Sequence, residues 1–188
     1  GTAAVVNNAT LSFNRSDAIT VANSMSGTGA LIKLGNNTLT ITGSNSFSGT
    51  TTISAGTLQI GDGGESGSIA STSAIRLGGG TLSINRSTAQ SLSNSITLTA
   101  NSTIHAETSA VTLTSVISGT GFGITKSGAA ELILTANNTY SGNTNVNAGV
   151  LTISSTGKIY SGLGRAGPVI TVGTGATLSL TDWRWDGS

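Results

Sequence analysis

The chain has 188 residues and a formal net charge of +1, and charged residues make up 8% of it, against about 25% in typical globular proteins. Its eight Lys and Arg residues are scattered singly, which excludes an electrostatic nucleic-acid interface, so we expect no nucleic-acid partner. No stretch approaches the roughly 18 consecutive apolar residues of a membrane span. Disorder is also excluded, because β-branched residues are abundant and alternate with polar ones.

Short alternating segments run along the whole chain. Each places two side chains on one face of a strand, with Thr or Ser mostly on the other. No segment shows a helical period over more than two turns, so we predict no helix. In chain order the pairs are Leu39/Ile41, Thr51/Ile53, Leu58/Ile60, Ile75/Leu77, Leu82/Ile84, Ile96/Leu98, Val111/Leu113, Leu132/Leu134, Leu151/Ile153, Ile170/Val172 and Leu178/Leu180. Glycine-rich stretches such as residues 78–80 separate them and predict tight corners.

One segment of the chain is present twice. Residues 33–60 and 126–153 match at a constant offset of 93 (126 − 33). The identical pairs include Lys33/Lys126, Leu39/Leu132, Asn45/Asn138, Gly49/Gly142, Thr51/Thr144, Gly56/Gly149, Leu58/Leu151 and Ile60/Ile153. A second theme, Thr-Leu-Ser, opens residues 10–16, 81–87 and 177–180. Repeated strands between glycine corners indicate a solenoid, in which each unit buries its apolar face against the next.

The strand spacing favours one architecture, an all-β right-handed parallel β-helix of about eight coils. Each coil should take roughly 20–25 residues, and residues 39–60 have the pattern of one coil. Ile53 and Leu58 are an odd number of positions apart, yet both should face inward, so the corner at Ala55 and Gly56 must absorb a flip of register. Coils about 4.8 Å apart give a rod on the order of 40 Å long. We expect the two copies to occupy matching levels of this spiral.

The repeats also predict the domain organisation. We expect one β-helix unit over residues 1–188, cut from a longer protein. Residues 1–32 have the pattern of the end of a preceding repeat unit, and residues 177–188 are a candidate start of a following module. The exposed strand edges at the two ends of such a fragment favour end-to-end self-association.

The two copies carry a recognisable motif. The pattern N-[TS]-[FY]-[ST]-G followed by T-x-[IV]-x-A-G-x-L, in residues 33–60 and 126–153, resembles the passenger-associated transport repeat, also called the autotransporter-associated β-strand repeat. The resemblance implies a right-handed β-helix in a large secreted or surface-anchored bacterial protein, with repeats that help the passenger to fold and to be exported. Adhesion is the activity most often attached to such passengers, and the family offers no catalytic residues to carry over. In the second copy Ala136 stands in place of Gly43, which leaves the fold prediction unchanged.

Candidate chemistry was weighed against a solvated surface. Glu107 and Glu131 are 24 residues apart and could stack on one face, but clustered carboxylates of the kind that polysaccharide-cleaving β-helix enzymes use are absent elsewhere. The single glycine-aspartate turn at residues 61–65 lacks the tandem copies that bind Ca²⁺. His105 is the only histidine and there is no cysteine, so zinc is not expected. A serine triad would need His105 beside a serine, with Glu107 as the acid two residues away on the same strand face, a spacing that arises by chance. We therefore predict no catalytic residue, no metal and no cofactor.

These observations favour a non-catalytic structural segment, a stalk or passenger of a secreted or cell-surface bacterial protein that supports export and display. The first alternative is an adhesin or carbohydrate-binding module whose partners are glycans or other cell-surface molecules. Its candidate ligand surface consists of the aromatic residues Trp183, Trp185, Tyr140 and Phe47. The second alternative is a polysaccharide-active β-helix enzyme.

Overall fold

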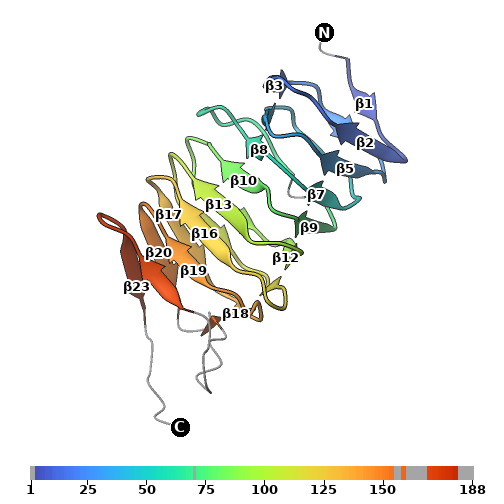
Figure 1. The fold of residues 1–188 in the computed structure, drawn as a ribbon. Helices are drawn as coiled ribbons and strands as arrows, with labels where there is room; N and C mark the ends of the chain where they lie inside the picture. Colours follow the sequence, from blue (N-terminus) through green and yellow to red (C-terminus); the bar gives the residue numbers. More distant parts are fainter. Residues whose placement is uncertain (1–2, 70, 155–157, 160–168, 182–188) are drawn as a thin grey trace.

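The computed structural model describes residues 3–69, 71–154, 158–159 and 169–181. The secondary structure of these residues consists of short strands, and they include no helix long and apolar enough to cross a membrane. Every pairing between the described strands is parallel. Strands that are neighbours in a sheet are therefore joined by long connections and not by hairpins, and the prediction of a parallel β-solenoid is confirmed (Figure 1).

The strands form three main sheets and two short pairs. The eight-strand sheet contains β3 (Ile19–Val21), β6 (Thr38–Ile41), β8 (Thr57–Ile60), β10 (Thr81–Ile84), β13 (Ser102–Ala106), β16 (Ile124–Ser127), β19 (Thr144–Val146) and β22 (Ile170–Val172). The six-strand sheet contains β2 (Thr10–Phe13), β5 (Ala30–Lys33), β7 (Thr51–Ile53), β9 (Ala74–Leu77), β12 (Ser95–Leu98) and β15 (Ile117–Ser118). The five-strand sheet contains β11 (Gln90–Leu92), β14 (Val111–Leu113), β17 (Glu131–Leu134), β20 (Val150–Ile153) and β23 (Thr177–Leu180). The pairs are β1 (Val5–Val6) with β4 (Met25–Ser26) and β18 (Asn137–Asn138) with β21 (Lys158–Ile159).

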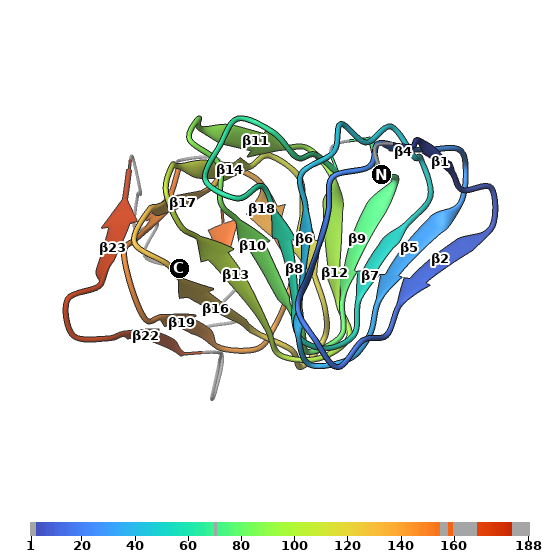
Figure 2. The same cartoon turned by 90° about the horizontal axis from the view of Figure 1, so that it is seen from above.

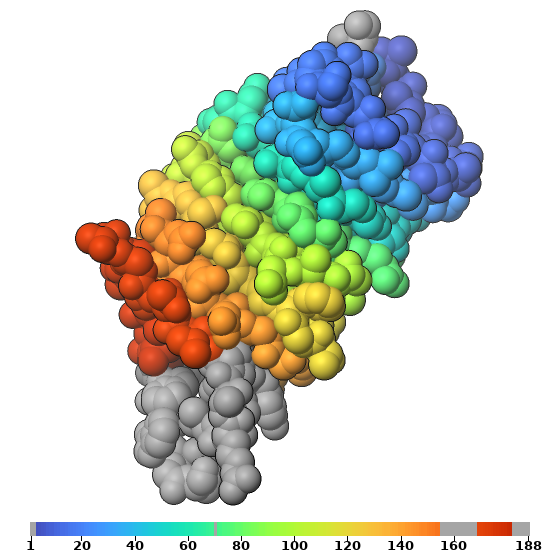
Figure 3. All heavy atoms as spheres, in the orientation of Figure 1, coloured from blue at the N-terminus to red at the C-terminus, as the bar shows by residue number. Residues whose placement is uncertain are grey.

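The chain visits the three sheets in a fixed order. From β9 to β17 it passes from the six-strand sheet to the eight-strand sheet, then to the five-strand sheet, and back. Figure 2 shows β11 and β14 on one side of the body and β13 and β16 on another. Each circuit adds one strand to each sheet, and bands of successive residues therefore lie side by side along the body (Figure 3). The right-handed sense of the winding remains a prediction, based on the general handedness of parallel crossovers.

The solenoid has about seven turns, one fewer than predicted. Val21 and Val172 lie in the first and last strands of the eight-strand sheet, 151 residues apart (172 − 21), which gives an average of about 22 residues per turn. The shortest turn, from Ile41 to Ile60, has 19 residues, and the longest, from Val146 to Val172, has 26. Seven intervals at about 4.8 Å span about 34 Å. The longest turn includes residues outside the described ranges.

The interior of the solenoid is filled by the inward positions of the strands. Leu, Ile and Val side chains from all three sheets form one continuous core, and most of them are less than 4% exposed. The predicted flip of register is confirmed, because Ile53 and Leu58 are both fully buried although they are five positions apart. Gly56 makes this possible with a φ of 62°, a left-handed conformation that glycine adopts without strain.

The two sequence copies have the same local structure but lie on different sheets. In the first copy β5 and β7 belong to the six-strand sheet, while β6 and β8 belong to the eight-strand sheet. In the second copy β16 and β19 belong to the eight-strand sheet, while β17 and β20 belong to the five-strand sheet. The 93-residue offset is therefore about four and one-third turns, and the expected placement of both copies at matching positions of the spiral is corrected.

The second theme advances in the same way. Its three Thr-Leu-Ser segments form β2, β10 and β23, which lie in the six-, eight- and five-strand sheets respectively. Each recurrence thus moves the theme one sheet further around the axis. The cause is a repeat length that is not a whole number of turns, because any feature with that period must rotate about the solenoid by the remainder.

Candidate functional site

The second copy contains a fully buried lysine. Lys126 is 0% exposed, because it alternates with the inward residue Ile124 in β16. Its Nζ donates to the backbone carbonyls of Ser127 at 2.8 Å, Gly128 at 2.7 Å and Ala148 at 3.0 Å. Three carbonyls match the three donors of an ammonium group. Burial lowers the pKa of Lys126 to about 8, from an ordinary value of 10.5.

Lys33 makes the equivalent contacts in the first copy. It is 3% exposed, and its Nζ donates to the carbonyls of Leu34 at 2.5 Å, Gly35 at 2.8 Å and Ala55 at 3.3 Å. Burial also lowers its pKa. Ala55 lies one turn beyond Lys33, as Ala148 lies one turn beyond Lys126. Each lysine therefore fixes its own corner and ties it to the next turn, and we call this arrangement the lysine clamp.

A buried asparagine in each copy continues the backbone ladder where no long strand does. The Oδ1 atom of Asn45 accepts from the Met25 backbone N–H at 2.8 Å, and its Nδ2 donates to the Ser68 carbonyl at 2.9 Å. Asn138 accepts from the Ile117 N–H at 2.8 Å in the same manner. Both asparagines are less than 9% exposed. Their amides satisfy buried backbone groups of neighbouring turns, which would otherwise be left unpaired at a cost in stability.

The aromatic residues of the two copies are interior residues. Phe47 is 1% exposed and Tyr140 is 0% exposed, and the Tyr140 hydroxyl lies 2.7 Å from the hydroxyl of Thr144. Burial raises the pKa of Tyr140 to about 12. Neither ring can form part of a ligand surface in the folded chain, which corrects that expectation for Phe47 and Tyr140. Trp183 and Trp185 lie outside the described residues.

The acidic residues are dispersed over the molecule. Glu131 begins β17 in the five-strand sheet and accepts a hydrogen bond from the Thr152 hydroxyl, whereas Glu107 follows β13 of the eight-strand sheet. The expected stacking of these two glutamates on one face is therefore not found. Asp62 accepts a long 3.4 Å hydrogen bond from the Gly64 N–H within its own turn. Within the described ranges, no three His, Asp or Glu side chains gather as a set of metal ligands.

One polar cluster joins two neighbouring strands of the eight-strand sheet. His105 of β13 is paired in register with Ser127 of β16, and both side chains point outward. The His105 Nδ1 lies 2.9 Å from the Ser127 Oγ, and its Nε2 lies 2.5 Å from the Glu107 Oε2. The His105 side chain is 30% exposed and that of Glu107 is 47% exposed. The spacing of His105 and Glu107, attributed above to chance, is thus part of a serine–histidine–glutamate line.

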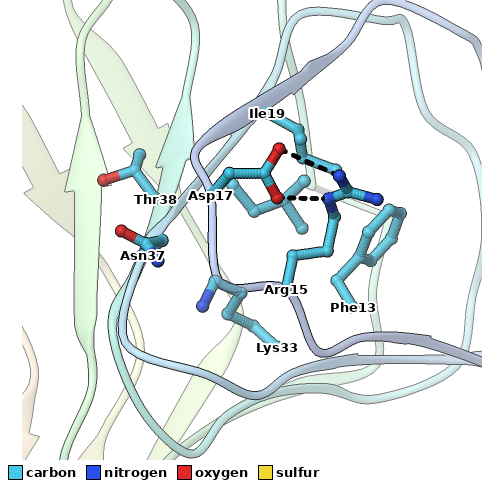
Figure 4. A pocket seen from close by; sticks show the side chains of 8 residues that line it. Phe13, Arg15, Asp17, Ile19, Lys33, Asn37 and Thr38 are labelled. Carbon is cyan, nitrogen blue, oxygen red and sulfur yellow. Dashed lines mark hydrogen bonds and ion pairs between the residues drawn. The ribbon is translucent and has the colours of Figure 1, made fainter.

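A shallow pocket lies at the first turns of the solenoid and holds an ion pair (Figure 4). Arg15 donates to both carboxylate oxygens of Asp17, at 2.8 and 2.9 Å. This hydrogen bonding lowers the pKa of Asp17 and raises that of Arg15. The two side chains are more than half exposed and satisfy each other, and the Lys33 Nζ at the pocket wall is occupied by its three carbonyls. We assign no ligand to this pocket.

Sequence reasoning missed the role of the two lysines. They were counted among scattered basic residues, although Lys33 and Lys126 occur at the same position of both copies. The signal was present, because each lysine lies two positions after an apolar residue, Leu31 or Ile124, in an alternating strand. A lysine in that position must either face inward or break the alternation.

Comparison with known proteins identifies the repeated segments. The family model described as Passenger-associated-transport-repeat matches residues 31–60 and 124–153. These are the two copies found in the sequence, each extended by two residues at its start. The comparison with curated proteins gave no match, and neither did the comparison with solved structures.

Proposed function

From a chain that carries two passenger-associated transport repeats, we propose a structural β-helical stalk or passenger segment of a secreted or cell-surface bacterial protein. Its role is mechanical: it supports export and displays what is attached to it. Stacked turns share their backbone ladders, and a solenoid of this kind can fold by adding one turn to the last.

The observation that carries the proposal is where the shared residues of the two copies lie. The residues that are identical or similar in both copies include the lysine clamps, the buried asparagines and aromatics, the inward aliphatics and the corner glycines. Outward positions differ, as Thr52 and Gln59 of the first copy show against Asn145 and Thr152 of the second. What is repeated is thus the means of building a turn, and not a surface.

The rotation of the copies supports the same role. A ligand surface built from equivalent positions of successive repeats would need those positions on one face, but the two copies lie one sheet apart. A spacer needs only equal stiffness on every side, which a rotating repeat supplies. The burial of Phe47 and Tyr140 also removes two of the four aromatic residues on which the carbohydrate-binding alternative depended.

The test fuses the chain between an epitope tag and an autotransporter translocation domain. We expect the tag to reach the cell surface with the wild-type chain. The display should fall several-fold with Gly142→Ala, which disrupts the contact between two turns, whereas the matched Gly64→Ala variant should behave as wild type. Equal display from both variants would contradict a role for the folded solenoid in export.

A glycan array with the purified chain separates the structural proposal from the binding alternative. The proposal expects no binding above background, since it assigns the surface no ligand. Specific glycan binding that is lost in Trp183→Ala or Trp185→Ala would replace it with a carbohydrate-binding module.

A further inference from the structure

We propose that Ser127 is a base-activated nucleophile, and that it accepts an acyl group from activated esters. The inference rests on the line from Ser127 through His105 to Glu107 on the outer face of the eight-strand sheet. It goes beyond the structural role and is independent of it, because a spacer needs no reactive group.

The hydrogen bonds of His105 set the direction of proton transfer. A carboxylate accepts only, so Glu107 at 2.5 Å from Nε2 requires the imidazole proton on that nitrogen. The Nδ1 atom is then left with its lone pair toward the Ser127 Oγ at 2.9 Å. His105 is thus oriented as a general base, with Glu107 stabilising the imidazolium that forms. This is the division of roles in a Ser–His–acid triad, with the two ring nitrogens exchanged.

The reaction is a transfer of an acyl group. The Ser127 Oγ attacks the ester carbonyl carbon and its proton moves to the His105 Nδ1. The bond from that carbon to the leaving oxygen breaks, and the leaving alkoxide or phenoxide takes the proton from His105. The products are an ester on Ser127 and a free alcohol or phenol. The exposed side chains of His105 and Glu107 let a small ester approach from solvent.

The same sheet limits the chemistry to this one transfer. β13 and β16 each pair with a strand on both sides, so their backbone N–H groups are engaged in the ladder. No pair of backbone donors is therefore free beside Ser127 to stabilise an oxyanion, as an efficient acyl-transfer enzyme requires. We expect modification of one serine without rapid turnover.

The repeat itself does not require this site. Ser127 corresponds to Leu34 in the first copy, at the offset of 93 residues, and both residues lie at the outward end of a strand that carries a lysine clamp. The fold tolerates either side chain at this position. The hydroxyl group beside the only histidine is thus a feature of the second copy alone.

The test treats the purified chain with p-nitrophenyl acetate and with a fluorophosphonate probe, and maps the labelled residue by mass spectrometry. We expect one label per chain on Ser127. Ser127→Ala should remove it, and His105→Gln should slow labelling by about 100-fold or more, the usual contribution of a general base. Glu107→Gln should slow it less. Thermal unfolding of each variant shows whether the fold is retained.

Ser83 provides the matched control. It lies opposite His105 on the other neighbouring strand, β10, but is only 4% exposed. Labelling of Ser83→Ala should match wild type. A label on the His105 ring, equal labelling of many serines, or an unchanged rate in a folded His105→Gln variant would overturn the proposal. Each of these results leaves the structural role intact.

Discussion

The lysine clamps place a charged side chain inside the solenoid at the one position where its donors have partners. Lys126 meets three carbonyls that the tight corner at Gly128 directs inward. Without the lysine these carbonyls would lack those hydrogen bonds, and without the carbonyls the buried ammonium would be unstable. The charge is still costly to bury, and this cost is expressed in the lowered pKa of Lys126.

The pKa of Lys126 predicts how stability depends on pH. Its value of about 8 in the folded chain is below the ordinary 10.5, so the folded chain releases this proton first. Between those values the unfolded chain binds more protons, and the free energy of unfolding should rise with pH. We expect a gain of about 2 kcal/mol from pH 7 to 9.5 in the wild type that Lys126→Met lacks. Denaturant unfolding at both pH values measures it, and an equal gain in the variant would contradict it.

Tyr140 predicts the opposite trend at higher pH. Burial raises its pKa to about 12, so the unfolded chain loses the phenol proton first, above the ordinary value of 10. The free energy of unfolding should then fall from pH 10 to 12, by on the order of 2 kcal/mol. Tyr140→Phe, which places the first copy's Phe47 ring at this position, should remove that part of the fall. If the alkaline loss persists undiminished in this variant, another group is responsible.

At the scale of the elements, the corners of the solenoid depend on glycine for two separate reasons. Gly56 and Gly149 have φ values of 62° and 63°, which other residues adopt only with strain. Gly49 and Gly142 are needed for a different reason, namely the close approach of the preceding turn. A Cβ at Gly49 would lie 2.2 Å from the Gly29 carbonyl oxygen.

The close approach leads to a prediction for the second copy. A Cβ at Gly142 would lie 2.2 Å from the carbonyl carbon of Phe122 in the preceding turn. Gly142→Ala should therefore lower the free energy of unfolding by about 1–3 kcal/mol. Gly64→Ala is the control, because the nearest atom there is 3.4 Å away on the Asp62 side chain, and it should change stability by less than about 0.5 kcal/mol. Equal losses in the two variants would refute the packing explanation.

At the scale of the whole molecule, the repeat rotates about the axis by one sheet per 93-residue unit. The second copy therefore brings its first strand, β16, beside β13 in the eight-strand sheet. Had the period been four whole turns, β16 would have continued the six-strand sheet that holds the corresponding β5. Three units would restore the original face, so a longer array would present each unit feature around the rod in turn.

Disulfide cross-linking tests this rotation, because the chain has no cysteine of its own. Thr103 and Thr125 are partners on the adjacent strands β13 and β16, at a separation that suits a disulfide. The double cysteine variant should cross-link fully on mild oxidation. The control pair Thr103 and Thr112 lies on different sheets and should not cross-link. The reverse result would refute the described register.

The sequence by itself determined the architecture and its local devices. Alternation in pairs such as Leu39 and Ile41 specifies which side chains enter the core, and the odd spacing of Ile53 and Leu58 requires a corner between them. These inferences held because strand alternation and glycine corners depend on residues close together in the chain.

Only the tertiary structure decided which faces the copies occupy and which side chains meet across turns. The rotation depends on the length of every intervening turn, from 19 to 26 residues, and small differences accumulate over four turns. The inward carbonyls around Lys126 and the meeting of His105 with Ser127 arise from neighbours about 22 residues apart. Such partners are fixed by the stacking of turns, because register between turns is set by packing and not by sequence separation.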